Sequence, residues 1–85
     1  MIPLSELEAE FGTVQSMDDG TMRTYRCLWF KLGDTYHMLP FAPESVLNRV
    51  WRHTSGDTLE DITLLPSYVC GEVHGFIREG HWVPC

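Results

Sequence analysis

The chain lacks an apolar run long enough to cross a membrane, and it has few basic residues. Each of these features argues against a class of function. A membrane-spanning helix needs about 20 consecutive apolar residues, and no stretch of these 85 residues approaches that length. The opening residues, MIPLSELEAEF, are acidic where a secretory leader would be basic, so we expect neither a membrane protein nor a secreted precursor. Six Lys and Arg against twelve Asp and Glu give a net charge of −6, which argues against direct nucleic-acid binding.

Cysteine is scarce and cannot be fully paired within the chain. The three cysteines, Cys27, Cys70 and Cys85, leave at least one thiol without an intrachain partner, and no Cys-x-x-Cys pair is present. An extracellular disulfide scaffold of this length usually carries about four to eight cysteines. We therefore predict reduced thiols and a cytoplasmic protein.

The composition favours a single folded domain that spans residues 1–85. The hydrophobic fraction is 44%, with ten aromatic residues, which is enough for one modest core. Proline and glycine punctuate the chain at short intervals, a pattern typical of hairpins. We predict a β-rich α+β fold: a small antiparallel sheet built from hairpins, with one or two short helices.

Two segments favour a helix. A capping-box pattern at residues 5–8 precedes apolar residues at helical spacing and predicts a helix of at most two turns that ends at Gly12. Residues Glu44–His53 follow Pro43, which suits a first helical position, and they also carry helically spaced apolar residues. The same residues suit a strand, but the prediction here is a short helix.

The remaining apolar segments alternate in the manner of strands. We predict strands at Thr21–Phe30, Thr35–Leu39, Asp61–Leu65, Val69–Ile77 and His81–Val83, with Pro66-Ser67 ending the third. A two-residue turn at Gly33-Asp34 fixes the register of the first hairpin and places Phe30 opposite His37. Cys27 then faces away from His37, because it lies an odd number of positions from Phe30. We interpret His37 as a half-buried strand residue.

The last hairpin predicts a group of metal ligands. A turn at Glu79-Gly80 places His74 opposite Cys85, and an unbroken strand keeps Cys70 on the same face as His74. Cys27 supplies a fourth ligand from a neighbouring strand. Thiolates with an imidazole are zinc-type ligands, so this set predicts a structural zinc site. The alternative is that the thiols pack as small apolar groups and that Cys85 frays as the last residue.

Catalytic signatures are weak. Cys70 and His74 are a candidate thiol–imidazole pair, but four residues along a strand span about 13 Å, and no oxyanion-hole motif accompanies them. Asp57, Glu60 and Asp61 fit a solvated acidic loop. The glycines are isolated and form no phosphate-binding loop. We therefore predict that the protein is not an enzyme.

Aromatic and acidic residues indicate a binding role. The ten aromatic residues exceed what so small a core hides, so some of them suit a surface that recognises a partner. The acidic residues recur along the chain. Dispersed, they would keep the protein soluble; concentrated on one face, they would imitate a phosphate backbone. The sequence leaves these two arrangements open.

Residues 25–85 resemble a family of small uncharacterised phage and bacterial proteins. The resemblance rests on Trp51…Gly56-Asp57…Ile62-Thr63-Leu64-Leu65-Pro66-Ser67…Cys70…His74-Gly75-Phe76-Ile77-Arg78-Glu79-Gly80, with Tyr25-Arg26-Cys27 similar to the family's lead-in to a cysteine knuckle. It implies a small zinc-bearing β domain of unassigned function, found among phage accessory genes. The second knuckle cysteine is missing here, since Leu28, Trp29 and Phe30 follow Cys27.

Three functions follow from these observations. The first is a non-catalytic accessory module, encoded by a phage or mobile element, that binds a protein partner and carries a structural zinc. The second is an acidic inhibitor of a host nucleic-acid enzyme, of the anti-CRISPR or other anti-defence type. The third is a small hydrolase that uses His74 with Cys70 or a metal. The position of the carboxylates separates the first two, because an inhibitor of this kind needs more than half of them on one face. The oligomeric state stays open.

Overall fold

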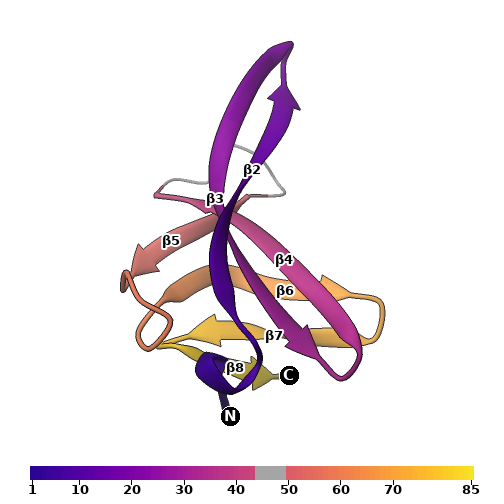
Figure 1. The fold of residues 1–85 in the computed structure, drawn as a ribbon, viewed down its shortest axis with the longest axis vertical. Coiled ribbons are helices and arrows are strands. Elements are labelled where there is room, and N and C mark those ends of the chain that lie inside the picture. The colour runs from indigo at the N-terminus through magenta and orange to yellow at the C-terminus, as the bar shows by residue number, and fades with distance from the viewer. Residues whose placement is uncertain (44–49) are drawn as a thin grey trace.

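The computed structural model describes residues 1–43 and 50–85, and these residues form one curled sheet of eight strands (Figure 1). The strands are β1 (Ile2–Pro3), β2 (Glu10–Asp18), β3 (Thr21–Leu32), β4 (Thr35–Ala42), β5 (Trp51–Ser55), β6 (Thr63–Cys70), β7 (Val73–Arg78) and β8 (His81–Pro84). Their order across the sheet is β1-β8-β7-β6-β5-β4-β3-β2. Every neighbouring pair is antiparallel except β4 and β5.

The predicted α+β class is wrong, because the described residues contain no α-helix. The expected N-terminal helix is a single 3-10 turn, η1 (Leu4–Glu6), and β2 begins shortly after it. The Lys31 N–H donates to the Leu7 carbonyl at 2.8 Å, so this carbonyl is not available to a continuing helix, and the Leu4 N–H donates to the Gly80 carbonyl at 2.9 Å. The N-terminal segment thereby connects β3 to the β7–β8 turn.

The second predicted helix, Glu44–His53, lies partly outside the described residues. Its last residues are wrong as a helix, since Trp51–Ser55 is strand β5. This segment pairs with β4 on one side and with β6 on the other, so its apolar residues serve a sheet. The strand alternative that the sequence left open applies to this end of the segment.

The two predicted hairpin registers are confirmed. Phe30 pairs with His37, and Ile77 pairs with Trp82. Both turns contain a glycine in the left-handed region, Gly33 at φ +61° and Gly80 at φ +75°. A two-residue turn leaves one register available, which is why the sequence predicted both pairings. Strand β2, which pairs with β3 along its whole length, was not predicted.

The predicted strand Val69–Ile77 is wrong because a hairpin turn interrupts it. The chain reverses at Gly71-Glu72, where Gly71 has φ +59°, and Cys70 pairs with Val73. The prediction that Pro66-Ser67 ends a strand is also wrong. Both residues lie within β6, where the pairing with β7 is irregular between Leu64 and Tyr68.

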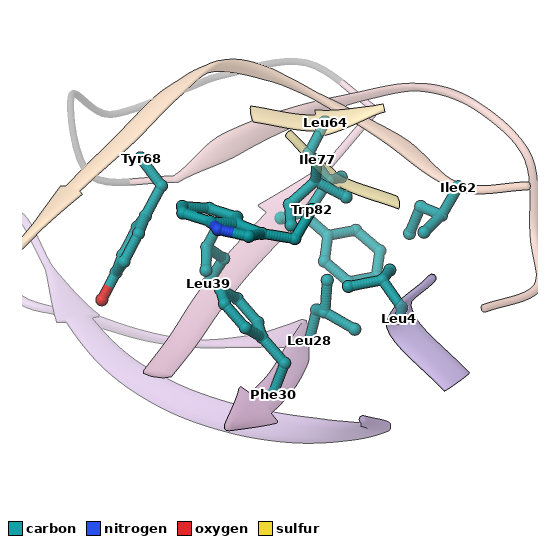
Figure 2. Packing of buried hydrophobic residues seen from close by; sticks show 10 residues of the cluster. Leu4, Leu28, Phe30, Leu39, Ile62, Leu64, Tyr68, Ile77 and Trp82 are labelled. Carbon is teal, nitrogen blue, oxygen red and sulfur yellow. The ribbon is translucent and has the colours of Figure 1, made fainter. Parts of the chain in front are cut away.

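The hydrophobic core fills the concave side of the curled sheet, as Figure 2 shows. It contains Leu4, Leu28, Phe30, Leu39, Phe41, Ile62, Leu64, Tyr68, Ile77 and Trp82. Leu4 enters it from η1 and is fully buried, so the 3-10 turn contributes an apolar side chain as well as backbone hydrogen bonds. The indole of Trp82 lies over Gly75, where an added Cβ would be 2.6 Å from the ring.

Within residues 1–43 and 50–85, no helix has the length and apolarity that a membrane crossing requires.

Candidate partner-binding face

The four C-terminal strands contain only basic ionisable side chains apart from Tyr68 and Cys70. Strands β5 to β8 include Arg52 and Arg78 and three of the four histidines of the chain, and they include no Asp or Glu. The chain as a whole has twice as many acidic as basic residues. The sheet formed by these strands is therefore a local exception to the charge of the protein.

The described carboxylates lie mainly in turns at the ends of the strands. They include Asp19 between β2 and β3, Asp34 between β3 and β4, Asp57, Glu60 and Asp61 between β5 and β6, Glu72 between β6 and β7, and Glu79 between β7 and β8. The β5–β6 loop and the β7–β8 turn lie side by side, since the Gly80 N–H donates to the Ile62 carbonyl, whereas the β2–β3 and β6–β7 turns lie away from them (Figure 1). The described carboxylates are thus dispersed around the molecule and do not share one face.

The basic residues of β5 and β7 lie on the outer side of the sheet, away from the core. Leu64 and Ile77 are buried in the core, so their neighbours Leu65 and Phe76 point to the other side, because side chains alternate along a strand. Arg52 pairs with Leu65 and shares that side. We call the surface formed by Arg52, Leu65, Pro66, Phe76 and Arg78 the basic face.

The basic face contains a shallow groove. It has a volume of about 460 Å³ and is lined by Arg52, Leu65, Pro66 and Phe76. The guanidinium carbon of Arg78 lies 5.0 Å from the centroid of the Phe76 ring, within the range of a cation–π contact. Apolar side chains therefore form most of the groove, with one arginine in its wall and a second stacked on its aromatic ring.

Both arginines of the basic face lack a carboxylate partner among the residues that the structure describes. Lys31, by contrast, is 3.4 Å from a carboxylate oxygen of Glu8. An unpaired arginine keeps its five N–H donors available, and their planar arrangement matches a carboxylate. The arrangement can bind an acidic group beside an apolar one.

The four residues predicted to bind zinc do not form one site in the described part of the chain. Cys27 is fully buried, whereas Cys70 and Cys85 are exposed. The hairpin does bring Cys85 beside His74, since the Cys85 N–H donates to the His74 carbonyl at 2.9 Å. No group of three or more potential metal ligands occurs among residues 1–43 and 50–85.

Cys70 and His74 are separated by the turn that the sequence did not predict. Cys70 pairs with Val73 while His74 pairs with Val69, so the two side chains lie on opposite faces of the β6–β7 hairpin. The expectation that an unbroken strand holds them on one face is wrong. In this arrangement the two side chains neither point toward a common metal ion nor form a nucleophile–base pair. Zinc binding itself stays a prediction, and elemental analysis of the purified protein tests it.

Cys70 instead interacts with Tyr68 on the inner side of β6. Burial, followed by a hydrogen bond with Cys70 and the charge of its thiolate, raises the pKa of Tyr68 to about 12. Tyr68 is also hydrogen-bonded to His37, which is buried rather than half-buried as predicted. Tyr68 and His37 are buried, and their hydrogen bond supports the fold.

Sequence reasoning did not single out Arg26, Arg52 or Arg78 as binding residues. The signal for Arg52 and Arg78 is the absence of Asp and Glu from the last four strands, which appears only when charges are counted strand by strand. The side chains of β6 and β7 can be assigned to a face of the sheet only when the Gly71-Glu72 turn is placed correctly. No signal in the sequence identifies the surroundings of Arg26, because they come from three separate strands.

Comparison with known proteins gives no match: neither a family model, nor a curated protein, nor a solved structure is similar to this chain.

Proposed function

We propose that this protein is a non-catalytic binding module whose basic face receives an acidic segment of a partner protein. The observation that carries the proposal is the charge of strands β5 to β8, which hold Arg52 and Arg78 and no carboxylate in a chain of net charge −6. Complementary charge steers association and sets the orientation of a partner. The basic, partly apolar surface attracts an acidic segment, and the acidic turns around the surface restrict where that segment can bind.

The groove defines the chemistry of that segment. Leu65, Pro66 and Phe76 offer apolar surface, and Arg52 stands at the same groove. Arg78, stacked on Phe76, places a second cation next to it. A segment with one apolar side chain and neighbouring Asp or Glu residues satisfies all of these groups, since desolvated arginines and an apolar anchor are the usual centre of an interface.

A nucleic acid fits this surface less well than a protein does. Each phosphate contact needs a cation, and the basic face supplies two arginines. Glu72 lies in the turn before β7 and Glu79 lies in the turn after it, so their carboxylates repel a polyanion at the two ends of β7. A short acidic peptide segment avoids these turns, whereas a long phosphate backbone crosses them.

The dispersed carboxylates favour this module over the acidic-inhibitor alternative. An inhibitor that imitates a phosphate backbone needs its negative charges on one face, and here the β2–β3 and β6–β7 turns lie away from the β5–β6 loop and the β7–β8 turn (Figure 1). The hydrolase alternative loses its thiol–imidazole pair, because Cys70 and His74 lie on opposite faces of their hairpin. The resemblance of residues 25–85 supports a phage or mobile-element accessory protein as the setting.

Selection of random peptides by the immobilised protein tests the proposal. The wild-type chain is expected to enrich peptides that combine an apolar residue with Asp or Glu, and the double variant Arg52→Glu/Arg78→Glu is expected to lose that enrichment. Arg23→Glu is the matched control, because Arg23 is an exposed arginine on β3, outside the basic face. Melting temperatures of all three proteins establish that they are folded. Acidic peptides enriched equally by the double variant, or not enriched by the wild type, would contradict the proposal.

A further inference from the structure

Arg26 contacts two aromatic rings on the inner side of the sheet. Its guanidinium carbon lies 5.1 Å from the ring centroid of Phe11 on β2 and 5.1 Å from that of Phe41 on β4. Phe41 is its cross-strand partner, so the pairing of β3 with β4 sets this position. The pairing of β3 with β4 begins at Arg26, whereas the pairing of β3 with β2 continues beyond it to Thr21. The β2–β3 hairpin extends beyond the rest of the sheet (Figure 1).

The two rings lie edge-to-face to each other, with planes 65° apart and centroids 6.1 Å apart, so both contact the guanidinium without covering its two opposite faces. The five N–H donors of a guanidinium lie in its plane. Within the described residues, the Arg26 side chain forms no ion pair and no hydrogen bond. The two aromatic contacts restrict its rotamers before any ligand arrives, so less conformational entropy is lost on binding. Arg26 is therefore a preorganised planar donor without a protein acceptor.

A cavity of about 260 Å³ opens beside this guanidinium. Arg26 lines it together with Thr24, Tyr25, Phe41, Ala42, Pro43 and His53. The ring of His53 is fixed on two sides: it packs edge-to-face against Phe41 with a centroid distance of 5.2 Å, and its Nε2–H donates to the Gly56 carbonyl. The lining thus combines one arginine with a few polar side chains and apolar walls, a composition typical of a small-ligand site.

We propose that this cavity binds a carboxylate attached to an apolar group, with Arg26 forming the bidentate contact. The planar fork of an arginine matches the two oxygens of a carboxylate. Phe41, Ala42 and Pro43 accommodate the apolar substituent. The single positive charge of Arg26 balances a monoanion. The carboxylate of Asp57 lies 3.8 Å from the His53 ring nitrogen and disfavours a doubly charged phosphate. The C-terminal carboxylate of a peptide and a free carboxylic acid both have this chemistry.

This site is separate from the basic face. Arg26 shares the inner side of the sheet with Phe41, whereas Arg52 and Arg78 belong to the outer side of other strands. Binding at one of them does not require binding at the other. A failed experiment at Arg26 leaves the proposed function untouched, and the converse also holds.

Titration of the ¹⁵N-labelled full chain, followed by NMR, tests the site with defined probes. The probes are 3-phenylpropanoate, the peptide Ala-Ala-Phe with a free C-terminal carboxylate, and the corresponding amide of each. Saturable shifts at Arg26, Thr24 and His53 are expected with a carboxylate and absent with its amide. Binding of the peptide alone identifies a C-terminal residue as the ligand, binding of the small acid alone identifies a free acid, and binding of both identifies the carboxylate as sufficient.

Variants connect the binding to the Arg26 guanidinium. Arg26→Gln is expected to weaken carboxylate binding at least tenfold, and Arg26→Lys nearly as much, because an ammonium lacks the planar fork. Phe11→Leu keeps the charge but removes one of the two aromatic rings and is expected to weaken binding a few-fold. Arg23→Gln, on the same strand with its side chain on the opposite face, is the control and retains binding. Equal shifts with carboxylate and amide, unchanged binding by Arg26→Gln, or no saturable shift up to about 10 mM probe would overturn the proposal.

Discussion

The imidazole Nδ1 of His37 lies 2.9 Å from the hydroxyl oxygen of Tyr68, and this buried hydrogen bond joins β4 to β6 across the interior of the curled sheet. The two strands are not neighbours in the sheet, since β5 lies between them. Phe30 stacks on His37 with a centroid distance of 5.5 Å and packs edge-to-face on Tyr68 at 6.1 Å. The other ring nitrogen of His37, Nε2, is buried without a hydrogen-bond partner. The pair therefore fixes the curvature of the sheet at the cost of one unsatisfied polar atom.

Loss of this hydrogen bond is expected to destabilise the fold. Tyr68→Phe leaves both ring nitrogens of His37 buried and unpaired, and an unsatisfied buried group costs about 1–3 kcal/mol of unfolding free energy. Tyr36→Phe removes a hydroxyl from a side chain that is 55% exposed and is expected to change stability by less than about 0.5 kcal/mol. Urea unfolding of both variants measures the difference. Equal stability of the two variants would show that the His37–Tyr68 contact contributes nothing.

The same tyrosine predicts a loss of stability at high pH. Burial, followed by the hydrogen bond and charge of Cys70, raises the pKa of Tyr68 from 10.0 to about 12. In the unfolded chain the hydroxyl loses its proton near pH 10, whereas the folded protein retains it until about pH 12. The stabilisation is complete below pH 10 and is lost as the pH rises to 12.

Comparison with Tyr68→Phe isolates this effect from the other groups that titrate in the same range. The wild type is expected to lose unfolding free energy relative to Tyr68→Phe between pH 10 and pH 12, as measured by urea unfolding at each pH. A difference between the two proteins that stays constant across this window would contradict the raised pKa.

The β7–β8 turn depends on the absence of a side chain at Gly80. Gly80 has φ +75°, and an added Cβ would lie 2.3 Å from the backbone of Glu60 in the β5–β6 loop. Gly20 has nearly the same φ, +79°, with nothing within 4 Å of its Cβ position. Gly20→Ala therefore carries only the left-handed backbone strain, about 1–2 kcal/mol, whereas Gly80→Ala adds a clash with a neighbouring backbone.

Thermal unfolding of the two alanine variants separates these contributions. Gly80→Ala is expected to melt several degrees below Gly20→Ala, since about 1 kcal/mol shifts a domain of this size by roughly 4–8 °C. Similar melting temperatures would mean that the loop and the turn are not in contact in solution.

The hairpins were predictable because their turns are short and local. Gly33-Asp34 and Glu79-Gly80 each leave one register, and the pairs Phe30–His37 and Ile77–Trp82 follow from counting. The Gly71-Glu72 turn was not predicted, because it lies within an apolar run that also reads as one strand. That single error placed Cys70 on the same face as His74 and so included it in the predicted group of metal ligands.

The N-terminal turn and the binding residues depend on contacts that are distant in sequence. Residues 5–8 have a helical signature, but the hydrogen bond from Lys31 to Leu7 limits the helix to one 3-10 turn. Local propensity is a weak prior when tertiary contacts compete with it. The contact of Arg26 with both Phe11 and Phe41 likewise requires three strands to be placed beside one another. The composition gives the net negative charge of the protein, but it does not show on which face the arginines lie.

Chemical-shift mapping tests the basic face most directly. A peptide with an apolar residue and neighbouring carboxylates, taken from the selection described above, is titrated into the ¹⁵N-labelled chain. Saturable shifts are expected at Arg52, Leu65, Phe76 and Arg78, and they are expected to weaken with added salt and to disappear in Arg52→Glu/Arg78→Glu. Shifts confined to other strands, or an unchanged affinity in the double variant, would contradict the central claim that this face binds the partner.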